Sequence, residues 1–117
     1  MNPLLAAFKA ACRPPDRRPP WQWAEDHITI DQTSPMPGRF RSGNAPWVKE
    51  VMEAFADNRV RYLSVLCSAQ SGKTQTTILC ACWAISEDPG PSMWVMAAKD
   101  EAQTFVRDRV APTFRQC

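Results

Sequence analysis

A short run near the middle of the chain has residue types and spacing suited to holding phosphate groups. The run is Cys67-Ser68-Ala69-Gln70-Ser71-Gly72-Lys73-Thr74. It matches the Walker A pattern G-x-x-x-x-G-K-[ST] at its last three residues. Small residues let successive backbone N–H groups turn toward one oxyanion, and Gly72 permits close approach of the backbone. Lys73 can then reach the β- and γ-phosphates of a nucleotide, and the Thr74 hydroxyl can complete the coordination sphere of Mg²⁺.

The loop departs from the Walker A pattern at its first position, where Cys67 stands in place of glycine. Ser68 and Ala69 remain small enough to turn. The alternative interpretation is a structural strand–turn–helix in which Lys73 is only solvated. The motif lies between an apolar segment and a helical segment, which is the context that phosphate loops require, so the sequence favours phosphate binding.

The elements around the loop alternate in type. Pro46 suits the start of a helix, and apolar residues from Trp47 to Phe55 recur at helical spacing. Residues 60–67 and 92–97 predict short buried parallel strands. Residues 73–86 predict a buried helix, and residues 100–110 predict a last helix that Pro112 ends. This order predicts an α/β fold, a partial P-loop NTPase domain with a parallel βαβ unit and right-handed crossovers.

The first 45 residues contain frequent helix and strand breakers. The tract Arg13-Pro14-Pro15-Asp16-Arg17-Arg18-Pro19-Pro20 removes backbone donors and restricts the residue before each proline. A short helix over residues 4–11 precedes it, and a second over residues 21–28 is expected to dock its tryptophans on the core. We therefore predict an irregular, proline-rich N-terminal arm over residues 1–45, followed by the first, incomplete part of the ATPase domain over residues 46–117.

Composition excludes several classes of protein. A chain of 117 residues with 14 Lys and Arg against 12 Asp and Glu is one small domain and not a strongly basic nucleic-acid tail. The five cysteines lack paired zinc-ligand spacing, and His27 is the only histidine. The longest apolar stretch, residues 78–85, is far shorter than the roughly 20 residues of a membrane span. Reduced thiols and a cytoplasmic location are the expectation.

The segment A-Q-S-G-K-T-Q, residues 69–75, resembles the phosphate loop of the large terminase subunits of tailed phages, in particular the lambda-type family. The resemblance extends over residues 39–114. It includes residues 60–66, the stop Asp88-Pro89-Gly90-Pro91 and residues 102–112, in the same order and spacing.

This resemblance implies a DNA-packaging motor subunit whose N-terminal ATPase drives DNA into a procapsid and whose C-terminal nuclease cuts the DNA. For this chain it implies that ATP and Mg²⁺ are the cofactors, with Mg²⁺ at Thr74. The implied ATP-binding residues are Ser68, Ala69, Gln70, Ser71, Gly72, Lys73 and Thr74. The implied partners are double-stranded DNA, the small terminase subunit, the procapsid portal and further copies of the subunit, with no membrane. The implied location is the cytoplasm of a host cell or a prophage-bearing bacterium.

A motor of this kind also needs an apolar strand that ends in Asp-Glu. Asp100-Glu101 is separated from its strand by Ala98 and Lys99 and follows the loop too closely, so Asp100 is interpreted as a helix N-cap. No catalytic residue is therefore assigned, and no acidic cluster for a two-metal nuclease is found. The chain is expected to be the first part of a longer protein and to be inactive in hydrolysis alone.

Two other functions stay open. One is another P-loop NTPase, such as a helicase-like enzyme, and the other is a truncated remnant without catalysis. Among single residues, packing is favoured over base stacking for Trp47, and ordinary surface ion pairs are expected for Arg107 and Arg109.

Overall fold

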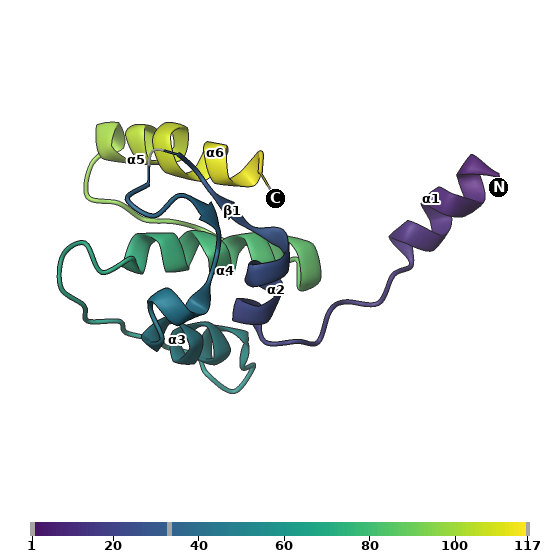
Figure 1. The fold of residues 1–117 in the computed structure, drawn as a ribbon, viewed down its shortest axis with the longest axis horizontal. Coiled ribbons are helices and arrows are strands. Elements are labelled where there is room, and N and C mark those ends of the chain that lie inside the picture. The colour runs from purple at the N-terminus through teal and green to yellow at the C-terminus, as the bar shows by residue number, and fades with distance from the viewer. Residues whose placement is uncertain (1, 33, 117) are drawn as a thin grey trace.

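The computed structural model describes residues 2–32 and 34–116, and its described elements are mostly helical (Figure 1). In chain order the elements are α1 (Pro3–Ala11), α2 (Pro20–His27), β1 (Thr29–Ile30), β2 (Gly38–Arg39), the 3-10 turn η1 (Ser42–Asn44), α3 (Trp47–Ala56), α4 (Lys73–Glu87), α5 (Lys99–Phe105), the π-helical turn η2 (Val106–Val110) and α6 (Ala111–Phe114).

Helix α4 is the central element of the core. Its buried residues are Thr76, Ile78, Leu79, Cys80, Cys82 and Trp83. Helices α2 and α3 pack on it and on each other, contributing Trp23, Ala24, Val48 and Met52 to one hydrophobic cluster. The sequence places apolar residues around most of the second half of α4, and such a helix must be covered on several sides. The helix expected over residues 73–86 is thus confirmed.

Helices α1, α2 and α3 confirm three further sequence predictions. Trp23 is buried in the core, its ring stacks on His27 at 4.8 Å, and its carbonyl lies 2.8 Å from His27 Nδ1. Trp21 lies at the edge, where its Nε1 donates to Glu53 at 2.9 Å and Lys49 lies 4.5 Å from its ring centroid. Both tryptophans of α2 therefore dock on the body, as predicted.

The predicted parallel strand pair is not confirmed. Residues 60–67 and 92–97 run without strand pairing, and the sheet of the described residues is the antiparallel pair β1–β2, with Thr29 opposite Arg39 and Ile30 opposite Gly38. A parallel strand is stable when both of its faces are covered. Here residues 60–66 are all exposed: Leu63 and Val65 line cavities beside α3 but are 43 % and 40 % exposed, and Tyr62 is 93 % and Leu66 is 102 % exposed. Neither face of this segment is buried by the described residues.

The last helix differs from its prediction at both ends. Its N-cap position is Ala98, and Asp100 lies in the first turn with Glu101, so the assignment of Asp100 as the N-cap was wrong. Both carboxylates still face the positive end of the helix dipole. Helical structure also continues past Pro112 to Phe114. Because proline clashes with the carbonyl four residues before it, the helix widens into η2 and bonds Ala111 N–H to the Val106 carbonyl.

The N-terminal 45 residues contribute to the core. Ile28 and Phe40 belong to the buried cluster, and Ser42 donates its N–H and hydroxyl to the Glu25 carboxylate. These bonds lower the pKa of Glu25. The domain boundary at residue 45 stays a prediction.

Helix α1 extends away from the body at the end of the proline-rich tract (Figure 1), and it buries no residue. Among the described residues no helix is both long enough and apolar enough to cross a membrane.

Two leucines provide a matched test of this core. Leu79 is 0 % exposed in α4, whereas Leu66 is 102 % exposed in the unpaired segment. Leu79→Ala is expected to reduce the free energy of unfolding by about 2–5 kcal/mol, because it removes buried contacts and leaves a cavity. Leu66→Ala is expected to change it by less than about 0.5 kcal/mol. Urea denaturation followed by tryptophan fluorescence measures both, and equal losses would contradict this core.

Glu87 at the end of α4 makes a pH-dependent connection to the arm. Its carboxylate accepts hydrogen bonds from the backbone N–H of Asp16, from Trp23 Nε1 at 3.0 Å and from the Ser86 hydroxyl. The Asp16 N–H, and after it the Ser86 and Trp23 donors, lower the pKa of Glu87, while burial and the Asp16 charge oppose them. A lowered folded-state pKa stabilises the fold above the unfolded-state pKa, and this stabilisation is lost as pH falls through the folded-state pKa.

We therefore expect Glu87→Gln to lower the unfolding free energy by about 1 kcal/mol at pH 7. The difference from the unchanged protein should shrink as pH falls from the unfolded-state pKa of about 4.3 through the lower folded-state pKa, below which both states bind a proton at Glu87. Thermal melts between pH 3 and pH 7 measure this, with Asp88→Asn at the exposed next residue as the control. A difference that does not depend on pH would show that the Glu87 charge is not involved.

Candidate functional site

The loop that connects the unpaired segment to α4 is sharply turned. Gln70 has φ 59° and Gly72 has φ 84°, so two residues within three positions adopt the left-handed region. Glycine adopts this conformation without a steric penalty, and Gln70 does so against the preference of a residue with a Cβ. The chain therefore reverses directly at the N-terminus of α4, and the sequence predicted this loop from its small residues.

The side chain of Lys73 bends back over the loop. Its Nζ donates to the Ser68 carbonyl at 3.1 Å, and the Ser71 hydroxyl donates to the same carbonyl at 2.8 Å. These two bonds tie the first residue of the loop to its last residues. They also keep the ammonium group of Lys73 beside the Ser68 carbonyl, although the residue is exposed.

Helix α4 begins at Lys73, so the N-terminus of the helix belongs to the same turn as this ammonium group. Its N-cap is Gly72, and no side chain caps the helix. The first-turn N–H groups therefore have no side-chain acceptor, and the helix dipole adds a partial positive charge at this point. The ladder begins with Thr76 N–H bonding to the Gly72 carbonyl at 2.9 Å, and the Thr76 hydroxyl donates to the same carbonyl at 3.0 Å.

A cavity of about 770 Å³ opens beside the loop. Its walls come from residues 70–76, from residues 34–41 of the β1–β2 region and from η2. The charged members of its described lining are Arg39, Arg41, Lys73 and Arg109, and no carboxylate is among them. Four cationic side chains around one cavity favour a ligand with several negative charges.

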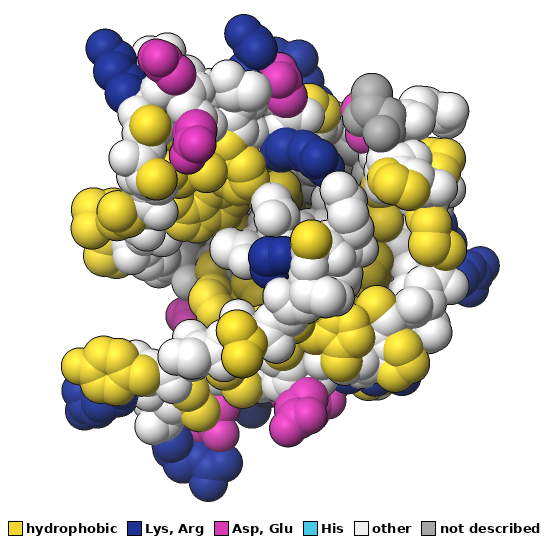
Figure 2. Space-filling view, turned by 90° about the vertical axis from the view of Figure 1, so that its left-hand side faces the viewer, with side chains coloured by type: hydrophobic (Ala, Val, Ile, Leu, Met, Phe, Trp, Pro, Cys, Tyr) yellow, Lys and Arg dark blue, Asp and Glu magenta, His cyan; other side chains and the backbone are white. Residues whose placement is uncertain are grey.

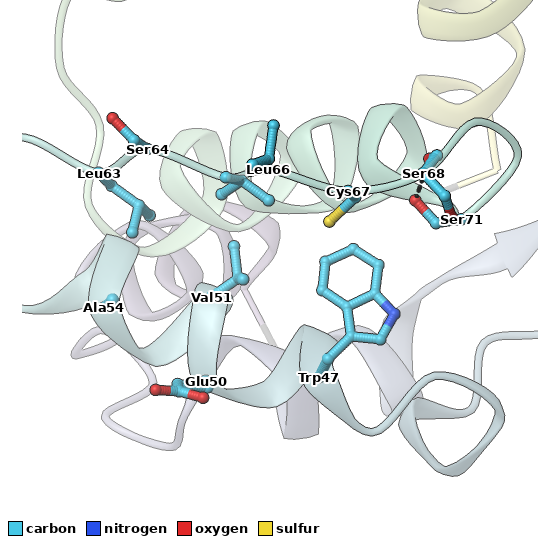
Figure 3. Close-up of a pocket in the computed structure, with 11 residues that line it drawn as sticks. Trp47, Glu50, Val51, Ala54, Leu63, Ser64, Leu66, Cys67, Ser68 and Ser71 are labelled. Carbon is cyan, nitrogen blue, oxygen red and sulfur yellow. Dashed lines mark hydrogen bonds between the residues drawn. The ribbon is translucent and has the colours of Figure 1, made fainter.

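Two smaller cavities lie on the other side of the loop, against α3. One of about 580 Å³ is lined by Trp47, Val51 and Leu63, and the Trp47 ring lies beside the Cys67 side chain (Figure 3). The second, of about 410 Å³, has Lys73 and Thr74 in its wall. Trp47 is partly buried and packs against the core, in agreement with the packing role favoured from the sequence. Lys73 and Thr74 thus lie between a mainly apolar cavity and the cationic one.

Figure 2 presents this end of the molecule, where hydrophobic side chains surround the polar loop.

The cationic cavity also contains a donor without a partner. Gln75 lines it, and the buried Nε2 atom of Gln75 has no hydrogen-bond partner within the described part of the chain. At Gly72 an added Cβ would meet nothing within 4 Å, so the backbone there faces open space. Ammonium, guanidinium, amide and helix N–H groups are donors, and a polyphosphate supplies acceptor oxygens. The residues present therefore fit a nucleotide, and the exposed Thr74 hydroxyl is the oxygen they offer to a Mg²⁺ ion.

The structure brings together some of the residues that the sequence singled out and adds others. All seven predicted residues form the loop and the first turn of α4. Asp100 and Glu101 lie in α5 and line none of the three cavities. Sequence reasoning did not place Arg39, Arg41 and Arg109 at the site. No local pattern marks them, because they come from segments far from the loop in sequence.

Comparison with known proteins gave one match. A family model described as phage terminase large subunit gpA, ATPase domain, matches residues 34–117. No curated protein and no solved structure matched the chain. The matched residues cover the loop, α3, α4 and the helices that follow.

The loop conformation predicts different effects for two glycine substitutions. Both Gly72 and Gly90 have open space where a Cβ would be placed, but of the two only Gly72 has a positive φ. Gly72→Ala is expected to cost about 1–2 kcal/mol of unfolding free energy through backbone strain. Gly90→Ala is expected to be neutral or to stabilise by up to about 1 kcal/mol. Urea denaturation measures both, and an unchanged Gly72→Ala protein would mean that the loop does not need its left-handed residue.

Proposed function

The chain belongs to the ATPase-domain family of the phage terminase large subunit gpA, and we propose that residues 68–74 bind the triphosphate of ATP. The observation that carries this proposal is the position of Lys73. Its ammonium group closes the loop at the N-terminus of α4, and the residue lines a cavity together with three arginines and no carboxylate in the described lining. In the proposed complex the nucleotide phosphates replace the Ser68 carbonyl as the partner of Lys73. Backbone N–H groups of the loop and the first turn of α4 donate to the phosphate oxygens.

Magnesium ion would neutralise charge on the bound phosphates and orient them. The residue that would hold it is Thr74, whose hydroxyl lies at the start of α4, next to Lys73. Asp100 and Glu101 lie outside the cavities, so we assign them no part in activating water. We therefore assign to the described residues the binding and orientation of ATP.

In the intact terminase, we propose that turnover of this nucleotide is coupled to the movement of double-stranded DNA into a procapsid. The family match supports the terminase ATPase assignment. Contacts with a small subunit, a portal and further copies of the subunit, together with a nuclease elsewhere in the protein, complete the proposal. A helicase-like ATPase would share the loop, and dependence of turnover on a procapsid distinguishes the two.

The test of nucleotide binding is Lys73→Ala. It removes the charge at the loop, and we expect the affinity for Mg·ATP to fall by about 10- to 100-fold, the equivalent of about 1.5–3 kcal/mol for a charged hydrogen-bonding group. Titration with a fluorescent ATP analogue measures this. Lys99→Ala, at the first residue of α5, is the control and should bind as the unchanged protein does.

Thr74→Ala separates the role of the metal from that of the phosphates. We expect it to weaken binding in the presence of Mg²⁺ and to have no effect in EDTA, because its hydroxyl acts on the ion. Thermal melts show whether each variant folds. If a folded Lys73→Ala protein binds ATP with unchanged affinity, the loop is not the nucleotide site.

A further inference from the structure

Three arginines line the cationic cavity, and they differ in what their side chains contact. Arg39 donates to the Glu25 carbonyl at 2.7 Å and to the Asp26 carbonyl at 3.2 Å, so its guanidinium holds the β1–β2 region on α2. Arg41 makes no hydrogen bond or ion pair within the described residues, but its charge, after the Ser42 bonds, helps to lower the pKa of the Glu25 carboxyl. Both arginines therefore interact with groups of α2, Arg39 by hydrogen bonds and Arg41 by its charge.

Arg109 does not interact with α2. Like Arg41, its guanidinium makes no hydrogen bond or ion pair within the described residues, and the one carboxyl whose pKa its charge is found to lower is that of Asp108. The nearest carboxylate in sequence, Asp108, is paired with Arg107 at 2.7 Å. The hydrogen bonds from Arg107 lower the pKa of Asp108, and the charge of Arg109 contributes to the same shift. The Asp108 oxygens bond to Arg107 and not to Arg109. A guanidinium in the wall of a cavity without carboxylates is available for an anionic ligand.

The backbone that carries Arg109 is fixed. Val110, the next residue, packs against the core, and Thr113 is buried with its hydroxyl donating to the Arg109 carbonyl at 2.9 Å. Arg109 lies in the π-helical turn η2, where the widening caused by Pro112 changes the direction of side chains relative to a regular helix. This anchoring places Arg109 in the wall of the cavity, where its side chain is exposed to solvent.

We propose that Arg109 is a second cationic contact for the phosphate chain of the nucleotide, from the part of the cavity wall that η2 provides. This inference rests on the proposed ATP binding by residues 68–74. Lys73 holds the phosphates from the loop, and Arg109 holds them from η2, with the planar guanidinium donating to two oxygens. Because Arg109 belongs to the α5–α6 segment, bound phosphate then connects that segment to α4 and stabilises their packing.

The matched pair Arg109→Ala and Arg107→Ala tests the proposal. The two residues lie on the same turn and carry the same charge, but Arg107 is paired with Asp108 and does not line the cavity. We expect Arg109→Ala to weaken ATP binding roughly tenfold, as for loss of one charge-assisted contact, and Arg107→Ala to change it by less than about twofold. Arg109→Lys keeps the charge without the fork and should give an intermediate affinity.

Inorganic tripolyphosphate identifies the part of the ligand that Arg109 contacts. As a competitor of the fluorescent ATP analogue, it should displace the analogue less effectively from Arg109→Ala than from Arg107→Ala. Equal ATP and tripolyphosphate affinities for the two folded variants would overturn the proposal. A loss of double-stranded DNA binding with unchanged ATP affinity would also overturn it and assign Arg109 to the nucleic acid.

Lys73→Ala keeps this test distinct from that of the proposed function. If Lys73→Ala loses ATP binding and Arg109→Ala does not, only the role of Arg109 fails. If the unchanged protein and Lys73→Ala bind ATP equally, or neither binds it, the proposed nucleotide site fails and the role of Arg109 fails with it.

Discussion

The burial of helix α4 is the constraint on which the rest of this structure depends. A helix in which the successive residues Ile78, Leu79 and Cys80 are all buried must be covered on several sides, and α2 and α3 pack on it for that reason. The same burial fixes the two ends of the helix. At one end the chain must turn through Gly72 into the loop, and at the other Glu87 receives the backbone N–H of Asp16. The position of the loop over residues 67–74 thus follows from the hydrophobic packing of α4.

The site consists of a rigid part and a part assembled from distant segments. The rigid part is the turn closed by Lys73 and Ser71 on one carbonyl, which needs only local backbone geometry. The assembled part is the cationic wall, to which the β1–β2 region and η2 contribute. Grouping four like charges around one cavity costs electrostatic repulsion, and an anionic ligand removes that cost. A cavity that favours an anionic ligand in this way is consistent with the ATP binding proposed for a member of this ATPase family.

Two segments of the chain have exposed apolar side chains and are not paired as strands. Residues 60–67 and 93–96 have hydrophobic side chains on both faces, and Tyr62, Leu66, Met93 and Val95 are largely exposed. Strand hydrogen bonds form only when a neighbouring strand presents its own backbone groups. The described residues leave residues 60–66 exposed beside α3 and provide no strand partner, so both segments remain unpaired although their sequences favour strands.

The sequence alone predicted the loop, the helices over residues 4–11, 21–28 and 73–86, a helix that starts near Pro46, and the resemblance to the terminase family, because each depends on local pattern or on a short motif. The structure has these helices within one or two residues of those bounds, and the family model matches. The sequence did not determine the pairing of the predicted strands, the continuation of the last helix through Pro112 or the N-cap at Ala98. These depend on what covers a strand and on how a helix adjusts around a proline. Only the tertiary structure decided that Arg109 lines the same cavity as Lys73, because this proximity results from the packing of Val110 on the core.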